Sequence, residues 1–300
     1  MILMKRRGFR LGKIRSGVSQ RDPVPTINRD WVIQHSHVLT PRDVAMLQLL
    51  REYPVMTTEH LYILTPQTTM KNGQTIKPFY LSRCGKQLCR DRIRVLFNHH
   101  FVNKAAPRLP IGEGTSVQFI WLDRAGYKYL DEEGRPPKGL SAEYQHHANI
   151  LNAYCMLVEL ARQDVISIDY MRVCYSYKPS TATIEPDLIV AFKKEGYGYK
   201  YLIEVDNCEK KEVEELRKLE KYRDWELGSQ WIKEPWAAIY KQRFPRVLYL
   251  FSGSAKKVAR RIKVFSERAK EVECKGDFLK LDDFMDKVLN LGHNVHKEDV

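Results

Sequence analysis

The sequence predicts a two-domain protein of mixed structure, with an α+β domain followed by an α/β domain. Between residues 40 and 130, three helical patterns are followed by a β-hairpin pattern. A stretch rich in glycine and proline at 131–141 then interrupts the periodic patterns. After this stretch the elements follow in the order αβββαβ. We therefore expect a domain at 37–130, a linker at 131–141 and a second domain at 142–300.

The first two helices of the N-terminal domain are indicated by their start signals. Thr40 precedes Pro41 and Asp43, and a threonine cap followed by proline and an acid is typical of a helix N-terminus. Apolar residues at helical spacing follow and give this helix a buried face. After a break at Pro54, Thr57 begins a second, shorter helix.

A third helix is predicted to begin with a cap at Ser82 and to reach about His99. At 100° per residue, its basic side chains fall on one arc and most of its apolar side chains on the opposite arc. This segregation is typical of a recognition helix, which seals a core with one face and enters the major groove with the other. A solvated basic face would show the same pattern. The candidate DNA-binding residues here are Arg83, Lys86, Gln87, Arg90 and Arg94.

Arg92 interrupts this pattern because it falls in the apolar arc of the same helix, together with Leu88. We expect Arg92 either to lie where that arc meets solvent or to extend its charged end past the core.

A β-hairpin is predicted after the third helix, with strands at 101–104 and 117–122. The turn-rich segment between them carries Arg108, a sixth candidate for contact with the DNA backbone or minor groove. Three helices and a hairpin in this order predict a winged helix-turn-helix domain.

The charge of the chain favours a polyanionic partner. Its formal net charge is +13, and no window approaches the roughly 18 apolar residues that a membrane helix needs. Nucleic acid is therefore the expected partner, with no membrane association, and the expected location is the cytoplasm. Residues 1–36 are predicted to form a flexible basic arm. The six cysteines include no Cys-x-x-Cys pair, so neither a zinc site nor a disulfide framework is expected.

Three carboxylates mark the ends of two predicted strands in the second domain. Asp187 opens the strand at 187–192, and Glu204 and Asp206 end the next one. The last two point to the same side because strand side chains alternate between faces. Clustered carboxylates repel one another unless a cation joins them, so all three are candidate ligands of Mg²⁺. Alternatively, Asp187 caps a turn and the other two acids form salt bridges.

Pro186-Asp187 followed by Glu204-Val205-Asp206 resembles the PD-(D/E)xK signature of the restriction-endonuclease-like fold. This resemblance implies the αβββαβ core and a metal-dependent nuclease in which a lysine positions or deprotonates the attacking water. Asp206 stands where that family places its lysine. A lysine of the following helix could replace it, and four are available: Lys210, Lys211, Lys218 and Lys221. Lys218, near the centre of the helix, is our candidate, and the choice among the four stays open.

From Leu39 to Phe251 the chain is similar to the replication-relaxation family of plasmids and other mobile elements. Four groups of residues carry this similarity: Leu39-Thr40-Pro41-Arg42-Asp43, Thr57-Thr58-Glu59-His60-Leu61, Trp121-Leu122-Asp123-Arg124-Ala125-Gly126, and His147 with Asn152 on one helix. The Glu-Val-Asp strand followed by residues 216–222 completes it. The resemblance implies DNA binding connected with replication or control of a mobile element, and so an association with plasmid or nucleoid DNA.

Two functional hypotheses follow from the sequence. The first is a sequence-directed double-stranded DNA-binding protein that acts in plasmid replication or its regulation. Its further partners would be replication or mobilisation proteins and a second copy of the chain. The alternative is a metal-dependent endonuclease or nickase targeted by the winged helix, with catalytic residues Asp187, Glu204, Asp206 and Lys218 and Mg²⁺ as its cofactor. The missing signature lysine favours the first hypothesis.

Overall fold

The computed structural model describes residues 26–70, 72–106, 117–131, 136, 140, 143–173, 184–239 and 243–291. Contacts divide these described residues into two units, one up to Leu151 and one from Asn152 onward. The boundary between the units falls within helix α6 (Tyr144–Arg162). Each unit is described by itself. No helix in the described part of the chain is long and apolar enough to cross a membrane.

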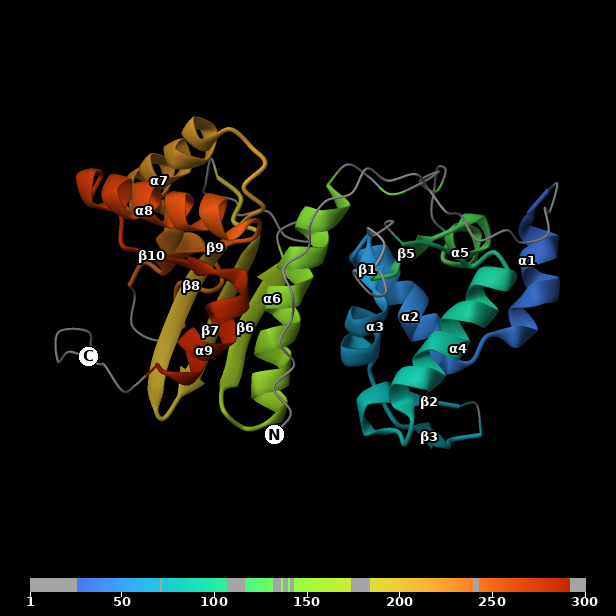
Figure 1. The fold of residues 1–300 in the computed structure, drawn as a ribbon. Helices are drawn as coiled ribbons and strands as arrows, with labels where there is room; N and C mark the ends of the chain where they lie inside the picture. Colours follow the sequence, from blue (N-terminus) through green and yellow to red (C-terminus); the bar gives the residue numbers. More distant parts are fainter. Residues whose placement is uncertain are drawn as a thin grey trace. The chain divides into compact units, whose positions relative to one another are not determined.

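The unit up to Leu151 contains short helices around a small antiparallel sheet (Figure 1). The sheet order is β1-β5-β4, and β5 pairs with both neighbours in antiparallel register. The helices and the strands of this sheet are α1 (Arg29–His35), α2 (Pro41–Glu52), β1 (Met56–Thr57), α3 (Thr58–Leu64), α4 (Gly85–Asn98), β4 (Val102–Ala105), β5 (Phe119–Leu122) and α5 (Arg124–Tyr129).

Local cap chemistry begins α2 and α3 at the predicted residues. Thr40 accepts a hydrogen bond from the backbone of Asp43, whose carboxylate accepts one from the backbone of Thr40. Thr57 and His60 exchange the same two bonds at the start of α3. These reciprocal bonds satisfy amides that have no partner within the helix.

The start of α4 differs from the prediction. Ser82 does not cap it, because the Ser82 hydroxyl donates to the carbonyl of Pro78. The helix begins at Gly85, after Cys84 in the left-handed region at φ 59°. A Cβ atom on Gly85 would lie 1.8 Å from the carbonyl oxygen of Phe79. Only glycine allows this close approach of two main-chain segments.

Two further segments of this unit also differ from their predictions. Residues Arg29–His35, expected within a flexible arm, form helix α1, which Asn28 caps. The segment before α4, for which no strand was predicted, contains the strands β2 (Thr68–Thr69) and β3 (Thr75–Ile76), which pair as a hairpin. The predicted linker lies mostly outside the described residues.

The unit from Asn152 onward contains a five-stranded mixed sheet of order β10-β9-β8-β7-β6. The pairs β6–β7 and β7–β8 are antiparallel, and β8–β9 and β9–β10 are parallel. Its strands and main helices are β6 (Ser167–Val173), β7 (Leu188–Lys194), β8 (Tyr197–Asp206), α7 (Glu212–Leu227), β9 (Arg246–Phe251), α8 (Ala255–Glu271), β10 (Gly276–Lys280) and α9 (Phe284–Leu289). From α6 to β9 the order is αβββαβ, as expected, and β10 and α9 extend it.

In the core of this second unit, helices α7 and α8 pack against one face of the sheet. Leu219 and Tyr222 of α7 and Phe265 of α8 are fully buried with sheet residues such as Leu202 and Tyr249. Consecutive residues of β7 and β8 are buried, so both faces of the sheet are covered.

The aromatic segment after α7 belongs to the same core. Trp225, Trp231 and Trp236 are at most 6% exposed, and the rings of Trp231 and Trp236 are parallel with centroids 6.1 Å apart. These tryptophans are therefore packed inside the unit and do not form an open stacking surface.

Candidate functional site

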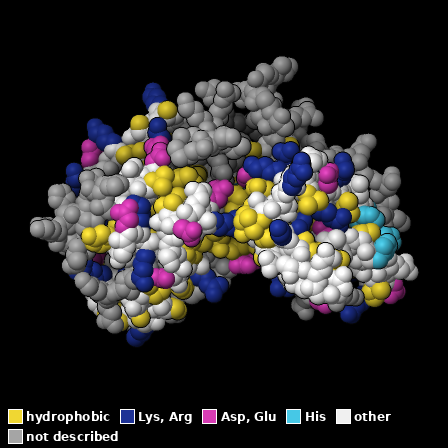
Figure 2. Space-filling view, turned by 90° about the horizontal axis from the view of Figure 1, so that it is seen from below, with side chains coloured by type: hydrophobic (Ala, Val, Ile, Leu, Met, Phe, Trp, Pro, Cys, Tyr) yellow, Lys and Arg dark blue, Asp and Glu magenta, His cyan; other side chains and the backbone are white. Residues whose placement is uncertain are grey.

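A basic face follows helix α4 of the first unit. Arg83, Gln87, Arg90 and Arg94 are exposed, whereas Cys89, Ile93 and Leu96 are buried on the opposite side. Gln87, Arg90 and Arg94 recur at helical spacing and so form one row along the helix, and Arg83 lies just before its start. We call these four residues the α4 face. Figure 2 shows Lys and Arg side chains in dark blue on the surface of this unit.

The members of the α4 face differ in their neighbours. Gln87 donates to Asp91 at 3.2 Å, and Arg94 pairs with the same carboxylate at 3.1 Å. Arg83 and Arg90 form no ion pair with any described residue. Their guanidinium groups are therefore available to bind an anion or a base edge.

Lys86 has a different environment from the α4 face. Its amine pairs with Glu59 at 2.9 Å, and its side chain is 41% exposed. The amine also lies 5.2 Å from the centre of the Tyr62 ring. Lys86 thus links α4 to α3, and Glu59 offsets part of its charge.

Arg92 is partly exposed, as expected for the edge of the apolar arc, but it forms an ion pair that neither expectation included. Its guanidinium donates to both carboxylate oxygens of Asp43 and to the carbonyl of Val38. The Asp43 side chain is fully buried, and that of Arg92 is 22% exposed. Leu88, expected in the buried arc, is 37% exposed. The ion pair therefore joins α4 to the start of α2 and keeps Arg92 out of the basic face.

Arg108, the candidate at the tip of the predicted wing, lies outside the described residues.

The three predicted metal ligands of the second unit form two separate groups, not one. Glu204 is 1% exposed and pairs with Lys218 of α7 at 2.7 Å. Lys218 also pairs with Glu215 at 2.9 Å, and the Tyr222 hydroxyl donates to the second oxygen of Glu204. A helix-borne lysine thus reaches the acid, and of the four lysines considered it is Lys218.

Asp187 lies next to this group. Its carboxylate accepts a hydrogen bond of 2.7 Å from the backbone amide of Val205, the residue after Glu204. Its negative charge acts on both Glu204 and Lys218. The structure therefore brings Asp187, Glu204 and Lys218 together.

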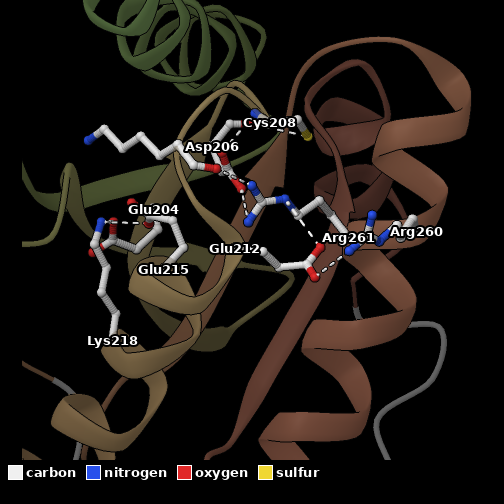
Figure 3. A network of polar contacts seen from close by, with 9 residues as sticks. Glu204, Asp206, Cys208, Glu212, Glu215, Lys218, Arg260 and Arg261 are labelled. Atoms are coloured by element: carbon white, nitrogen blue, oxygen red, sulfur yellow. Dashed lines mark hydrogen bonds and ion pairs between the residues drawn. The ribbon is translucent and has the colours of Figure 1, made fainter.

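Asp206 belongs to the second group. It is 4% exposed and lies 3.5 Å from Arg261 of α8, and its other oxygen accepts the amide of Cys208 at 2.7 Å. Arg261 also donates to the carbonyl of Lys210. Figure 3 shows the two groups apart, Glu204 with Glu215 and Lys218, and Asp206 with Arg261 and Glu212.

Burial controls the protonation of these groups. Burial raises the pKa of Glu204 to about 7, although the Lys218 charge opposes this shift. Burial lowers the pKa of Lys218, but the charges of Glu204, Asp187 and Glu215 outweigh it and leave the pKa raised. Burial also raises the pKa of Asp206, against the attraction of Arg261. Lys218 therefore stays charged at any ordinary pH.

The fit of these residues to a metal ion follows from their partners. Among the described residues, no three acidic, histidine or cysteine side chains converge as metal ligands. Both oxygens of Glu204 contact Lys218 or Tyr222, and Asp206 is directed at Arg261. In this arrangement the three predicted ligands do not form one Mg²⁺ site.

Sequence reasoning missed Glu215, Tyr222 and Arg261, although helical spacing could have found them. Glu215 and Tyr222 lie three residues before and four residues after Lys218, the predicted lysine, and so share its face of α7. Arg261 lies three residues after Val258 and four before Phe265, on the buried stripe of α8. A charge in a buried stripe indicates a buried partner.

Comparisons with known proteins add little to this geometry. No family model and no curated protein matches the chain. Among solved structures, the chain is similar to the restriction endonuclease FokI, with 12% identity, a TM-score of 0.29 and coverage of 86% of this chain and 45% of that one. It is also similar to FokI bound to DNA, with 10% identity, a TM-score of 0.29 and coverage of 83% and 44%. The chain spans less than half the length of these two structures.

Proposed function

We propose that the chain is a sequence-directed double-stranded DNA-binding protein. In this proposal the unit up to Leu151 acts as a winged helix, with α4 as recognition helix and the β4–β5 hairpin as wing. One observation carries the proposal: α4 exposes Arg90 and Arg94 on one face, with Arg83 exposed just before its start, and buries its opposite face in the core. Arginine pairs with guanine edges through two hydrogen bonds and also contacts phosphates.

A role in plasmid replication or its regulation is the finer part of this proposal. It rests on the resemblance of residues 39–251 to the replication-relaxation family. The second unit would then serve assembly or DNA contact without cutting DNA. A homodimer and replication or mobilisation proteins are the partners that this role implies, since winged helices often bind paired half-sites as dimers.

We expect Arg90→Ala or Arg94→Ala to weaken binding to the target duplex by about 1–3 kcal/mol if the side chain reads a guanine edge. Arg90 has the larger expected effect, because Asp91 already offsets the charge of Arg94. Sequencing the genomic fragments retained at physiological salt would identify the duplex, and fluorescence anisotropy would then give the affinity.

Lys128→Ala is the control for these two variants, because Lys128 is an exposed cation on α5. If Arg90→Ala and Arg94→Ala bind with the affinity and salt dependence of the wild type, α4 is not the recognition helix.

A metal-dependent endonuclease or nickase is the second candidate function. The observation that favours it is the contact of Lys218 with Glu204 beside Asp187, which supplies a lysine that the sequence signature lacks. Glu204 and Asp206 each contact a cation of the chain itself, and this arrangement favours the non-cutting role.

Incubation with supercoiled plasmid, with and without Mg²⁺ or Mn²⁺, distinguishes the two functions. We expect no cleavage under any of these conditions. If the wild type cleaves the plasmid, the Asp187→Asn variant does not and the Asp169→Asn variant does, the nuclease becomes the favoured function. The asparagine keeps an oxygen for the Val205 amide and removes the charge, whereas Asp169 is a carboxylate on β6 that pairs with Lys193.

A further inference from the structure

We propose that the β2–β3 hairpin and the segment joining it to α4 form a second DNA contact. They would bind the phosphates that flank the base pairs contacted by α4. We call the described residues 67–70 and 72–77 the polar hairpin. This inference rests on the proposed DNA-binding function. The polar hairpin lies between α3 and α4, so it is distinct from the β4–β5 hairpin that would act as the wing.

The charge of this part of the sequence fits a polyanion. Residues 60–90 contain no aspartate or glutamate, although the chain has 37 acids in all. The same segment carries five cations: Lys71, Lys77, Arg83, Lys86 and Arg90. A phosphate backbone therefore meets no carboxylate of this segment on its approach.

The side chains of the polar hairpin suit phosphate oxygens. Hydroxyl, amide and ammonium groups are the donors that proteins commonly use toward phosphates. The exposed donors here are Gln67, Thr69, Asn72, Gln74, Thr75 and Lys77. Only Thr68 and Ile76 of the two strands are half-buried. The hairpin thus presents most of its polar groups to solvent.

The hairpin has a defined conformation. The Met70 amide donates to the Gln74 carbonyl at 2.8 Å, and the Gly73 amide donates to the Met70 carbonyl at 2.9 Å. The Asn72 side chain accepts the Gln74 amide at 3.0 Å, and Gly73 has the positive φ of 82° that the turn requires. A preformed turn loses little conformational entropy when it binds.

Contacts of Arg42 and Phe79 attach the hairpin to the first turn of α4. Arg42, which is 7% exposed, donates to the carbonyl of Lys77 and lies over the Phe79 ring at 4.5 Å. Phe79 is fully buried, and its carbonyl contacts Gly85. Residues 77 and 85 are thus held together by groups that have no part in the exposed surface.

This attachment determines where the hairpin would meet DNA. Recognition helices of this kind present their N-terminal residues to base edges. Figure 1 shows β2 and β3 beside that end of α4, and Figure 2 looks onto the same end, where uncharged polar surface borders dark-blue cations. Phosphates flanking the bases at the start of α4 would therefore face the polar hairpin.

The test measures the salt dependence of binding to mixed-sequence duplexes of about 20 base pairs, two turns of DNA. Lys77→Gln should reduce the slope of log K against log salt by about 1 and weaken binding about fivefold at 0.15 M salt, for every sequence alike. The main chain of residue 77, which Arg42 binds, is unchanged in this variant. Thr75→Glu adds an acid at an exposed position and should weaken binding further. Lys128→Gln is the matched control.

The inference would be overturned if Lys77→Gln and Thr75→Glu leave the slope of log K against log salt unchanged while Arg90→Ala weakens binding. The proposed function would then remain intact. No binding of wild-type protein to any duplex would overturn both. A loss for Lys128→Gln equal to that for Lys77→Gln would also overturn it, because general charge would then explain the effect.

Discussion

Replacing Lys218 with methionine is expected to destabilise the second unit by about 3 kcal/mol at pH 8. Glu204 is 1% exposed and would lose its cation, and Glu215 would lose the same partner. Methionine retains most of the side-chain volume, so the loss would report the charge and not a cavity. Urea unfolding followed by tryptophan fluorescence, with EDTA present, measures it, since Trp225, Trp231 and Trp236 lie in this unit.

The loss of stability caused by Lys218→Met should be smaller at pH 5 than at pH 8. The folded pKa of Glu204, about 7, lies above its ordinary value of 4.5. The folded state therefore binds this proton more tightly than the unfolded state, and the stability it adds at low pH is lost as pH rises from about 4.5 to 7. Without Lys218 the folded pKa would rise further, because the cation that lowers it is gone. The loss would then continue above pH 7.

Glu204→Gln provides the control for this expectation. Glutamine retains an oxygen for the Tyr222 hydroxyl but cannot ionise, so the change in stability between pH 4.5 and 7 should flatten. Lys218→Met in the Glu204→Gln background should cost less than it does alone, because only Glu215 then loses a partner. Equal costs in the two backgrounds would show that the Glu204–Lys218 pair contributes nothing.

Arg92→Met is expected to destabilise the first unit by about 3 kcal/mol, because it leaves the buried carboxylate of Asp43 with only its contacts to Thr40. Amide hydrogen exchange in α2 and α4 measures the effect on this unit. Amides of α7 serve as the internal reference, because α7 belongs to the other unit.

Arg90→Met on the same helix is the matched control. Arg90 is exposed and forms no ion pair with a described residue, so its replacement should change stability by less than about 0.5 kcal/mol. The two variants should therefore separate, with Arg92 affecting folding and Arg90 affecting DNA affinity. Similar losses of protection for both would contradict the assignment of Arg92 to the core.

Elements determined by local chemistry could be predicted from the sequence. The caps at Thr40 and Thr57 depend on residues three positions away, and both were predicted correctly. The runs of apolar residues in β7 and β8 also predicted strands near the observed places. The predicted start of α4 at Ser82 was wrong. Serine is a favoured cap residue, but the helix begins at Gly85, where a main-chain contact with Phe79 determines the local structure.

Contacts between distant residues could not be predicted in the same way. Arg92 and Asp43 are 49 residues apart, and nothing near Arg92 in the sequence indicates its partner. The choice among four lysines required the position of α7 against β8, which brings Lys218 to Glu204. The β2–β3 hairpin was missed because its strands, Thr68–Thr69 and Thr75–Ile76, are too short to show the apolar alternation that indicates a strand.

The contact between Gly85 and Phe79 has a consequence for how such a protein can evolve. The orientation of α4 depends on this main-chain contact and on the buried residues Cys89, Ile93 and Leu96. None of the four exposed positions of the α4 face takes part in it. Descendants of this chain could therefore exchange those side chains while inheriting the same scaffold unaltered, and under the proposed function such exchanges would change the DNA sequence that the protein prefers.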